Sequence, residues 1–189
     1  MSTAKRNITQ RRFALLAVLG ESVFHVGDLA NLWEITDKNT LHTTLKRYVK
    51  QGLLFRVFRG LYAIKPLEKI DPLLLGVKTA REFAYVSTET ILSRSGIILQ
   101  EIPYITLVAK KSKKFSIAEN DYKSRQMNDM YLFNPVGIEI KNGVRMATVE
   151  RAVADMLYLN PRVYFDGRDL IDWKKVKKVQ KQIGFPLTK

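Results

Sequence analysis

The chain has 189 residues and contains no cysteine, which excludes disulfides, thiolate zinc sites and cysteine nucleophiles. Its 32 lysines and arginines against 18 acidic residues give a net charge of +14, which predicts a polyanionic partner, with nucleic acid favoured over a membrane surface. No apolar run is long enough to span a bilayer, and the apolar core of a signal peptide is missing, so a cytoplasmic protein is expected.

The first 65 residues are predicted to form three helices followed by a β-hairpin. Residues before about Ile8 are polar and basic and are expected to form a loose arm. Apolar periodicity and capping residues predict helices from Thr9 to Leu19, from Val26 to Trp33 and from Lys38 to Lys50. The turn between the second and third helices has the length found in a helix-turn-helix. Leu53 to Ile64 predicts an apolar-rich ribbon that turns at Gly60 and would form a wing.

The third predicted helix has one apolar face and one polar, basic face. Four apolar residues recur at helical spacing and are expected to face inward: Leu41, Leu45, Tyr48 and Val49. Side chains on the other face can donate to phosphate oxygens or to base edges, so we interpret residues 1–65 as a winged helix-turn-helix DNA-binding domain. The predicted contacts to base edges are Asn39, His42, Thr43 and Arg47. The other predicted DNA contacts are Lys38, Lys46, Lys50, Arg56 and Arg59, the last four directed to phosphates.

Residues 66–189 are predicted to form a mixed α/β domain after a linker from Lys65 to Pro72, which gives an α+β fold class for the whole chain. Helices are predicted from Pro72 to Ala84, from Ser87 to Gly96, from Thr148 to Leu159 and from Arg168 to Gly184. Strands are predicted at 85–86 and 104–109, and as a hairpin at 136–140 and 144–147 around an Asn-Gly turn.

A cluster of lysines follows the strand predicted at 104–109 and is expected to form a loop. This loop is either a solvated turn or a second basic patch that adds salt-sensitive affinity for nucleic acid. The lysines are Lys110, Lys111, Lys113 and Lys114.

Three segments together resemble the AbiEi-type antitoxins of type IV toxin-antitoxin and abortive-infection systems: 59–62, 85–90 followed by Gly96, and 147–155. The resemblance implies a winged helix that binds operator DNA and autorepresses its operon, and a second domain that counteracts a nucleotidyltransferase-like toxin, without need of a stable complex. Thr148, Glu150, Arg151 and Asp155 match the family's Thr-x-Glu-Arg-x-x-x-Asp pattern. We interpret them structurally, as a helix cap, a favourable N-terminal charge and an ion pair one turn apart.

Two alternatives remain open. The chain could be a stand-alone winged-helix regulator whose second domain senses a ligand or oligomerises. It could also be an enzyme, because Glu139 and Lys141 form the Glu-x-Lys of a metal-dependent nuclease if Asp129 or Asp121 lies nearby, although the adjacent Asn-Gly turn favours an exposed hairpin end. Because His42 has no second ligand at suitable spacing, we predict no metal site, and we also predict no cofactor and no catalytic residues.

Overall fold

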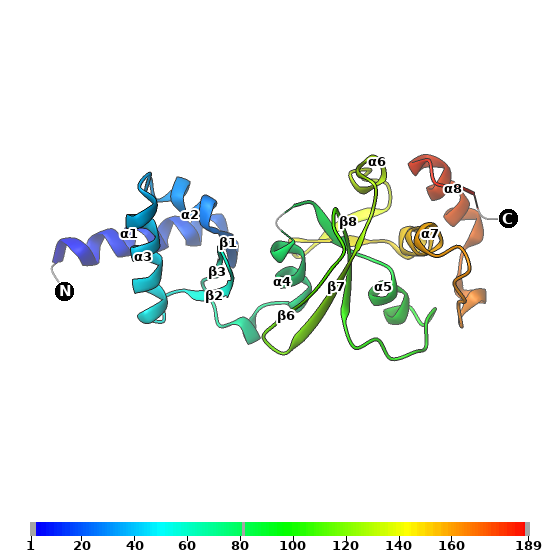
Figure 1. Cartoon of the computed structure of the whole chain (residues 1–189), viewed down its shortest axis with the longest axis horizontal. Coiled ribbons are helices and arrows are strands. Elements are labelled where there is room, and N and C mark those ends of the chain that lie inside the picture. The colour runs from blue at the N-terminus through cyan, green and yellow to red at the C-terminus, as the bar shows by residue number, and fades with distance from the viewer. Residues whose placement is uncertain (1–2, 81, 188–189) are drawn as a thin grey trace. The chain divides into compact units, whose positions relative to one another are not determined.

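The protein is described by a computed structural model over residues 3–80 and 82–187, with side chains described from Asn7 onward. It has an α+β fold that divides into two compact units, Met1–Ile70 and Asp71–Lys189 (Figure 1). The division falls five residues beyond the boundary predicted after Lys65. The difference arises because a 3₁₀ turn at Leu67–Lys69 and the buried Ile70 belong to the first unit.

Unit 1 contains three helices and a small antiparallel sheet, the arrangement of a winged helix-turn-helix. The helices are α1 (Thr3–Leu19), α2 (Val26–Leu32) and α3 (Lys38–Lys50). The strands are β1 (Val23–His25), β2 (Phe55–Phe58) and β3 (Leu61–Ala63), in the order β1-β3-β2. β1 was not predicted, because three residues are too few to show alternation. Its pairing with β3 joins residues far apart in sequence, such as Phe24 and Tyr62.

The loose arm expected before Ile8 is wrong, because α1 begins at Thr3. Ala, Lys and Arg at positions 4–6 are good helix formers, so the helix extends beyond the cap expected at Thr9. Thr9 lies inside α1, where its hydroxyl is hydrogen-bonded to the Tyr48 hydroxyl at 3.3 Å.

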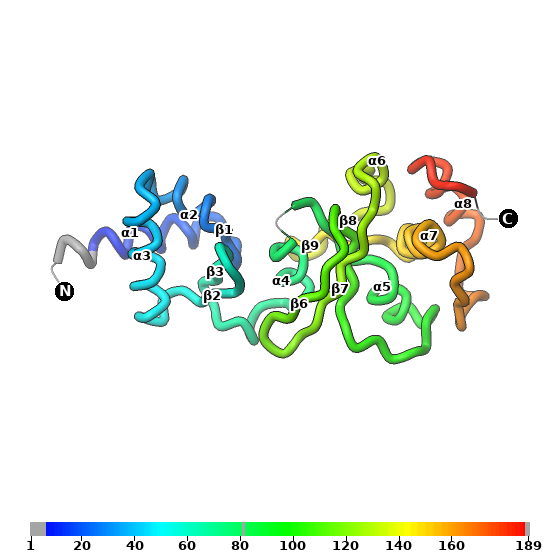
Figure 2. Tube along the Cα trace, in the orientation of Figure 1, coloured from blue at the N-terminus to red at the C-terminus, as the bar shows by residue number. Residues whose placement is uncertain are grey.

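Unit 2 is built on a six-stranded mixed sheet of order β6-β7-β5-β4-β9-β8, whose path Figure 2 traces. Its strands are β4 (Ala84–Val86), β5 (Ile105–Ala109), β6 (Lys113–Ile117), β7 (Asn120–Gln126), β8 (Ile138–Lys141) and β9 (Val144–Ala147). Its helices are α4 (Pro72–Thr79), α5 (Glu89–Arg94), α6 (Asp129–Leu132), α7 (Val149–Leu159) and α8 (Trp173–Ile183), with a 3₁₀ turn at Arg168–Leu170.

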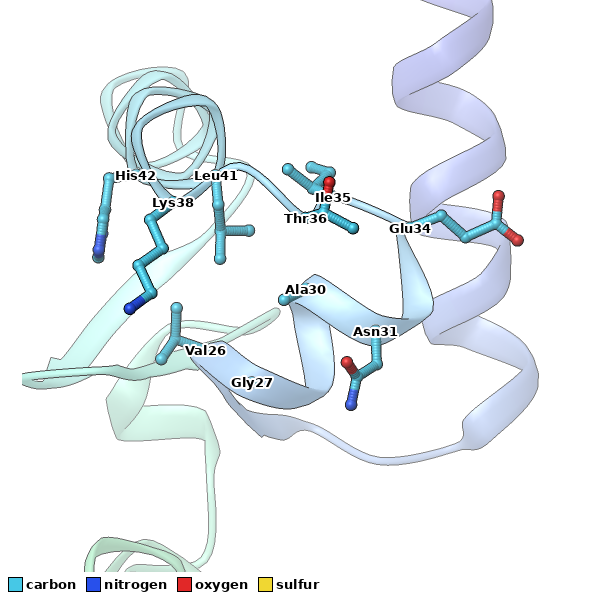
Figure 3. Close-up of a pocket in the computed structure, with 10 residues that line it drawn as sticks. All are labelled: Val26, Gly27, Ala30, Asn31, Glu34, Ile35, Thr36, Lys38, Leu41 and His42. Atoms are coloured by element: carbon cyan, nitrogen blue, oxygen red, sulfur yellow. The ribbon is translucent and has the colours of Figure 1, made fainter.

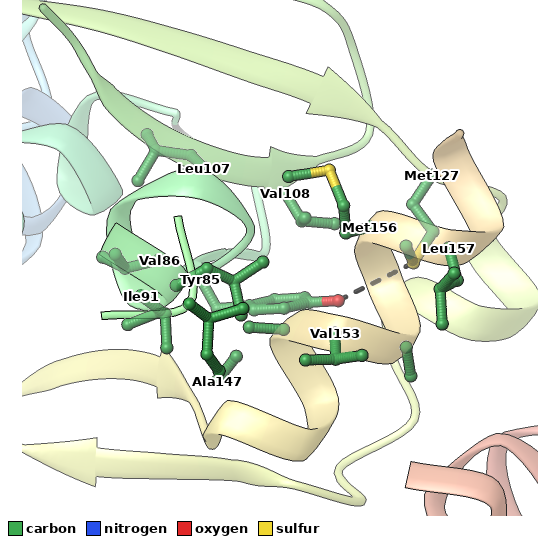
Figure 4. Close-up of a cluster of buried hydrophobic side chains, with 14 of the residues drawn as sticks. Tyr85, Val86, Ile91, Leu107, Val108, Met127, Ala147, Val153, Met156 and Leu157 are labelled. Carbon is green, nitrogen blue, oxygen red and sulfur yellow. Dashed lines mark hydrogen bonds between the residues drawn. The ribbon is translucent and has the colours of Figure 1, made fainter. Parts of the chain in front are cut away.

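Helices cover both faces of this sheet. Gly76 of α4 approaches Leu107 on one face, whereas Thr90 of α5 is hydrogen-bonded to Thr106 on the other. α7 lies on the same face as α5, and α8 packs against α7. Figure 4 shows the core between the sheet and α7, where Tyr85, Val108, Val153 and Met156 meet.

Four boundaries predicted in unit 2 need correction. The helix predicted to reach Ala84 ends at Thr79, and Ala84 begins β4 instead; Arg81, predicted in the same helix, lies outside the described residues. Ser87 does not cap α5, because its hydroxyl donates to Asp155 at 2.8 Å. Lys113 and Lys114 belong to β6 rather than to a loop. The last helix begins at Trp173 rather than at Arg168.

Candidate nucleic-acid interface

α3 is held at its start by a cap and along its inner face by aromatic packing. The Asp37 carboxylate accepts a hydrogen bond from the Thr40 backbone N–H at 2.8 Å, and its hydrogen bonds with Thr40 lower the pKa of Asp37. Tyr48 is fully buried, and the rings of Phe13 and Trp33 pack edge-on against it at 5.4 and 5.7 Å. These contacts fix which side of α3 faces outward.

The outward side of α3 is a polar and basic surface. Asn39, Thr43, Lys46 and Lys50 follow one another at spacings of four, three and four residues, so they form its central stripe. Arg47 lies on one flank, with its guanidinium carbon 5.3 Å from the centroid of the Tyr48 ring. All seven residues predicted to contact DNA from this helix are exposed: Lys38, Asn39, His42, Thr43, Lys46, Arg47 and Lys50.

The wing carries two exposed arginines, Arg56 on β2 and Arg59 in the β2–β3 turn. Gly60 completes this turn with φ +77, and its carbonyl accepts a hydrogen bond from the Val26 N–H at 2.9 Å, which ties the wing to the start of α2. An irregularity in the pairing falls between Arg56 and Phe58, and Phe58 is 46% exposed. Phe58 was not among the predicted contacts, because an aromatic residue in an apolar ribbon looks like core.

A cavity of about 680 Å³ opens between α2 and α3 (Figure 3). Val26, Ala30 and Leu41 line it with apolar groups, and the side chains of Lys38 and His42 lie on its α3 side. No pattern in the sequence indicates this cavity, since it depends on the packing of two helices. The surface beside the basic stripe is therefore apolar.

The second basic patch is partly neutralised within unit 2. Lys110 forms an ion pair with Asp129 at 3.2 Å, whereas Lys111, Lys113 and Lys114 are exposed. Lys114 lies directly opposite Lys123 of β7, an unfavourable pairing of like charges that extends the patch onto a second strand. Lys123, whose ammonium lies 5.1 Å from the centroid of the Tyr104 ring, could not be predicted because strand register was not readable from the sequence.

The residues of the nuclease alternative are not brought together. Glu139 and Lys141 form an exposed ion pair with each other at 2.8 Å on β8. Asp121 lies on β7, separated from β8 by three strands, and Asp129 pairs with Lys110. Within residues 3–80 and 82–187, no group of three or more histidine and acidic side chains is placed to hold a metal ion.

The Thr-x-Glu-Arg-x-x-x-Asp segment forms a cap and a buried ionic network. Thr148 accepts a hydrogen bond from the Arg151 backbone N–H at 3.2 Å, as predicted for a cap. The predicted pair of Arg151 and Asp155 is confirmed at 2.8 Å, but both side chains are fully buried, which the one-turn spacing did not indicate.

Arg151 satisfies its guanidinium entirely inside unit 2. Besides Asp155, it donates to the Tyr85 hydroxyl at 2.8 Å and to three backbone carbonyls, those of Tyr131, Asn134 and Val136. The Asp155 carboxylate also accepts hydrogen bonds from Tyr85 and Ser87. Burial and the Asp155 carboxylate raise the pKa of Tyr85, so the phenol stays protonated and donates. The network therefore joins α7, β4 and the segment that leads into β8.

No helix in the described part of the chain is long and apolar enough to cross a membrane. Comparison with known proteins finds no matching family model and no matching curated protein. The chain is similar to the crystal structure of the Rv2827c protein from Mycobacterium tuberculosis, with a TM-score of 0.55 over 95% of this chain and 72% of that one. The two sequences are 13% identical, so the likeness shows the fold.

Proposed function

We propose that this chain is an antitoxin of the AbiEi type that binds operator DNA, represses its own operon and counteracts a nucleotidyltransferase-like toxin. The observation that carries the DNA-binding part is the exposed stripe of α3 beside an arginine-bearing wing. A helix of this kind can enter the major groove, while side chains on the wing contact the DNA backbone. Bound in this way, the protein would occlude the promoter.

Within this proposal the residues of α3 divide by position. Asn39 and Thr43 lie in the N-terminal half of the central stripe, the part that recognition helices direct to base edges. Lys46 and Lys50 follow on the same stripe and contact phosphates, together with Arg56 and Arg59 of the wing. Specificity would then depend on Asn39 and Thr43, together with His42 and Arg47 on the flanks of the stripe, and affinity on the remaining cations.

The antitoxin part of the proposal is supported by the family resemblance in the segments 59–62, 85–90 and 147–155. In unit 2 most of these side chains are buried, and they act as a scaffold. The antitoxin surface would therefore consist of other, exposed residues of the chain.

DNA binding is tested by fluorescence anisotropy with the DNA upstream of the chain's own operon and with a scrambled duplex of the same length. We expect Asn39→Ala to weaken binding to the upstream DNA about 5- to 160-fold, because a side chain paired with a base edge contributes ~1–3 kcal/mol of discrimination. Binding to the scrambled duplex should change little. Equal losses on both duplexes would remove Asn39 from sequence recognition.

The antitoxin role is tested by co-expression with the product of the neighbouring gene. Rescue of growth by the wild-type chain would support it. Specific operator binding without rescue would instead favour a stand-alone regulator, and cleavage of plasmid DNA in Mg²⁺ or Mn²⁺ would favour an enzyme.

A further inference from the structure

β8 is an end strand of the sheet in unit 2, and its outer edge is open. In the order β6-β7-β5-β4-β9-β8, it pairs with β9 on one side, and no strand among residues 3–80 and 82–187 pairs with the other. Its side chains are also accessible, since Ile140 is 70% exposed and Glu139 and Lys141 are both exposed. An open edge of this kind is a template for another strand.

The backbone of Ile140 points to this open edge. Lys141 and Val144 flank the two-residue turn of the β8–β9 hairpin, so they form a hydrogen-bonded pair, and such pairs recur at every second residue. Gly137 fits this alternation, because its carbonyl accepts a hydrogen bond from the Thr148 N–H at 2.8 Å. Residues 137, 139 and 141 therefore bond toward β9. The N–H and C=O of Ile140 face outward.

We propose that the outer edge of β8 pairs in antiparallel fashion with β8 of a second copy of this chain, about a two-fold axis at Ile140. In this register the two Ile140 residues exchange N–H to C=O hydrogen bonds. Glu139 then lies opposite Lys141 of the second copy, and Lys141 opposite its Glu139. Both are non-hydrogen-bonded pairs, in which facing side chains approach most closely.

Charge selects this register over its neighbours. The pairing register can shift only in steps of two residues, because a residue whose N–H and C=O face the open edge must lie opposite another such residue. One shift places Glu139 opposite Glu139 of the second copy, and the other places Lys141 opposite Lys141. Like charges directly opposite are unfavourable, so the pairing centred on Ile140 is the attractive one.

On the other face of β8, the exposed Ile140 side chain adds apolar surface at the same edge. Ile140 lies opposite Arg145 of β9, whose guanidinium carbon is 4.9 Å from the centroid of the Phe83 ring. Phe83 packs in turn on Phe133 at 5.3 Å, and Phe133 is 53% exposed. The opposite edge of the sheet lacks these features. β6 begins with Lys113 and Lys114 and carries no acidic residue, which guards it against self-pairing.

The test is sedimentation equilibrium of the full chain at low salt over a range of concentrations, with Glu139→Lys and Lys141→Glu. We expect the wild-type chain to dimerise reversibly and each variant to dimerise at least tenfold more weakly, because two attractive pairs become repulsive. An equimolar mixture of the two variants should associate again, since one supplies two lysines and the other two glutamates. Mixing cannot restore the ion pair within one chain, so recovery reports the pair between chains.

A backbone variant provides an independent check. Ile140→Pro removes the outward N–H while the ladder to β9 stays intact, and it should abolish dimerisation, whereas Ile140→Val should retain it. A wild-type chain that stays monomeric, variants that dimerise like the wild type, or a mixture that fails to associate would each overturn the proposal. The assay contains no DNA, so its failure would leave the proposed operator binding untouched.

Discussion

Arg151 illustrates how one residue can determine the stability of a whole unit. In Arg151→Met the apolar stem is kept, but the Asp155 carboxylate and three backbone carbonyls lose their buried donor. Removing one partner of a buried ion pair costs ~3–5 kcal/mol, and we expect the free energy of unfolding of unit 2 to fall by about that amount. Urea denaturation followed by the fluorescence of Trp173, in a Trp33→Phe background, measures it.

The stability of unit 1 provides the control for this measurement. It has two tryptophans, one in each unit, so Trp33 in a Trp173→Phe background should report unchanged stability of unit 1. The double variant Arg151→Met/Asp155→Leu should recover part of the loss, because no buried charge is left unpaired. A single variant as stable as the wild type would show that the network contributes little.

At the scale of the element, the start of α3 should respond to acid through Asp37. Its pKa is lowered by hydrogen bonds from Thr40, so the folded state favours the carboxylate. The resulting stabilisation is present above the pKa of the unfolded chain and is lost as the pH falls through the lower pKa of the folded state. We expect unit 1 to lose stability below about pH 4, the ordinary range for this carboxyl group.

Asp37→Asn separates this effect from general acid denaturation. Asparagine caps a helix as well as aspartate does but does not titrate. The variant should match the wild type at pH 7 and lose less stability between pH 5 and pH 2, measured by urea midpoints with Trp33 as the reporter. Parallel pH profiles for the two proteins would contradict the assigned role.

Two glycines in helices give opposite predictions for one substitution. A Cβ on Gly76 of α4 would lie 2.6 Å from Cε1 of Tyr122, whose ring is fixed by stacking on Phe115 and by a hydrogen bond to the Pro72 carbonyl. Overpacking of ~1–3 kcal/mol should outweigh the gain in helix propensity of about 1 kcal/mol, so Gly76→Ala destabilises unit 2.

Nothing lies within 4 Å of a Cβ on Gly27 of α2, so Gly27→Ala should stabilise unit 1 by about 0.5–1 kcal/mol. Urea midpoints of both variants provide the test.

For the whole molecule, the positive charge is shared equally between the units. Unit 1 has 12 basic and 5 acidic residues and unit 2 has 20 and 13, an excess of seven in each. If α3 and the wing hold the DNA, Lys50→Ala should lower the slope of log affinity against log salt by about 1, since one phosphate contact is lost. Lys178→Ala, an exposed charge on α8, should leave the slope unchanged. A changed slope for Lys178→Ala would extend the DNA footprint onto unit 2.

Local signals in the sequence predicted the parts of the fold that depend on neighbours in the chain. The Asp37 cap, the inward spacing of Leu41, Leu45 and Tyr48, and the Asn-Gly hairpin turn each follow from a few adjacent residues, and the structure confirms them. The exposure of the α3 stripe follows from the same periodicity.

Features that depend on distant residues were not predictable in the same way. Lys123 joins the second basic patch only through its register with Lys114, and Arg151 is buried only because segments at 85, 131–136 and 155 converge on it. The pattern in the sequence shows an ion pair at helical spacing, and nothing in it distinguishes a solvated pair from a buried one. Strand order and burial are settled by packing across the whole unit.

The burial of the Arg151 network determines which positions can change as related chains diverge. A protein that keeps this segment keeps a scaffold, while its solvent-facing positions remain free to change. Two chains that share the segment can thus present different surfaces to different partners. The buried residues then preserve the fold, whereas the exposed residues determine binding specificity. Substitutions at exposed positions can change the specificity without destabilising the fold.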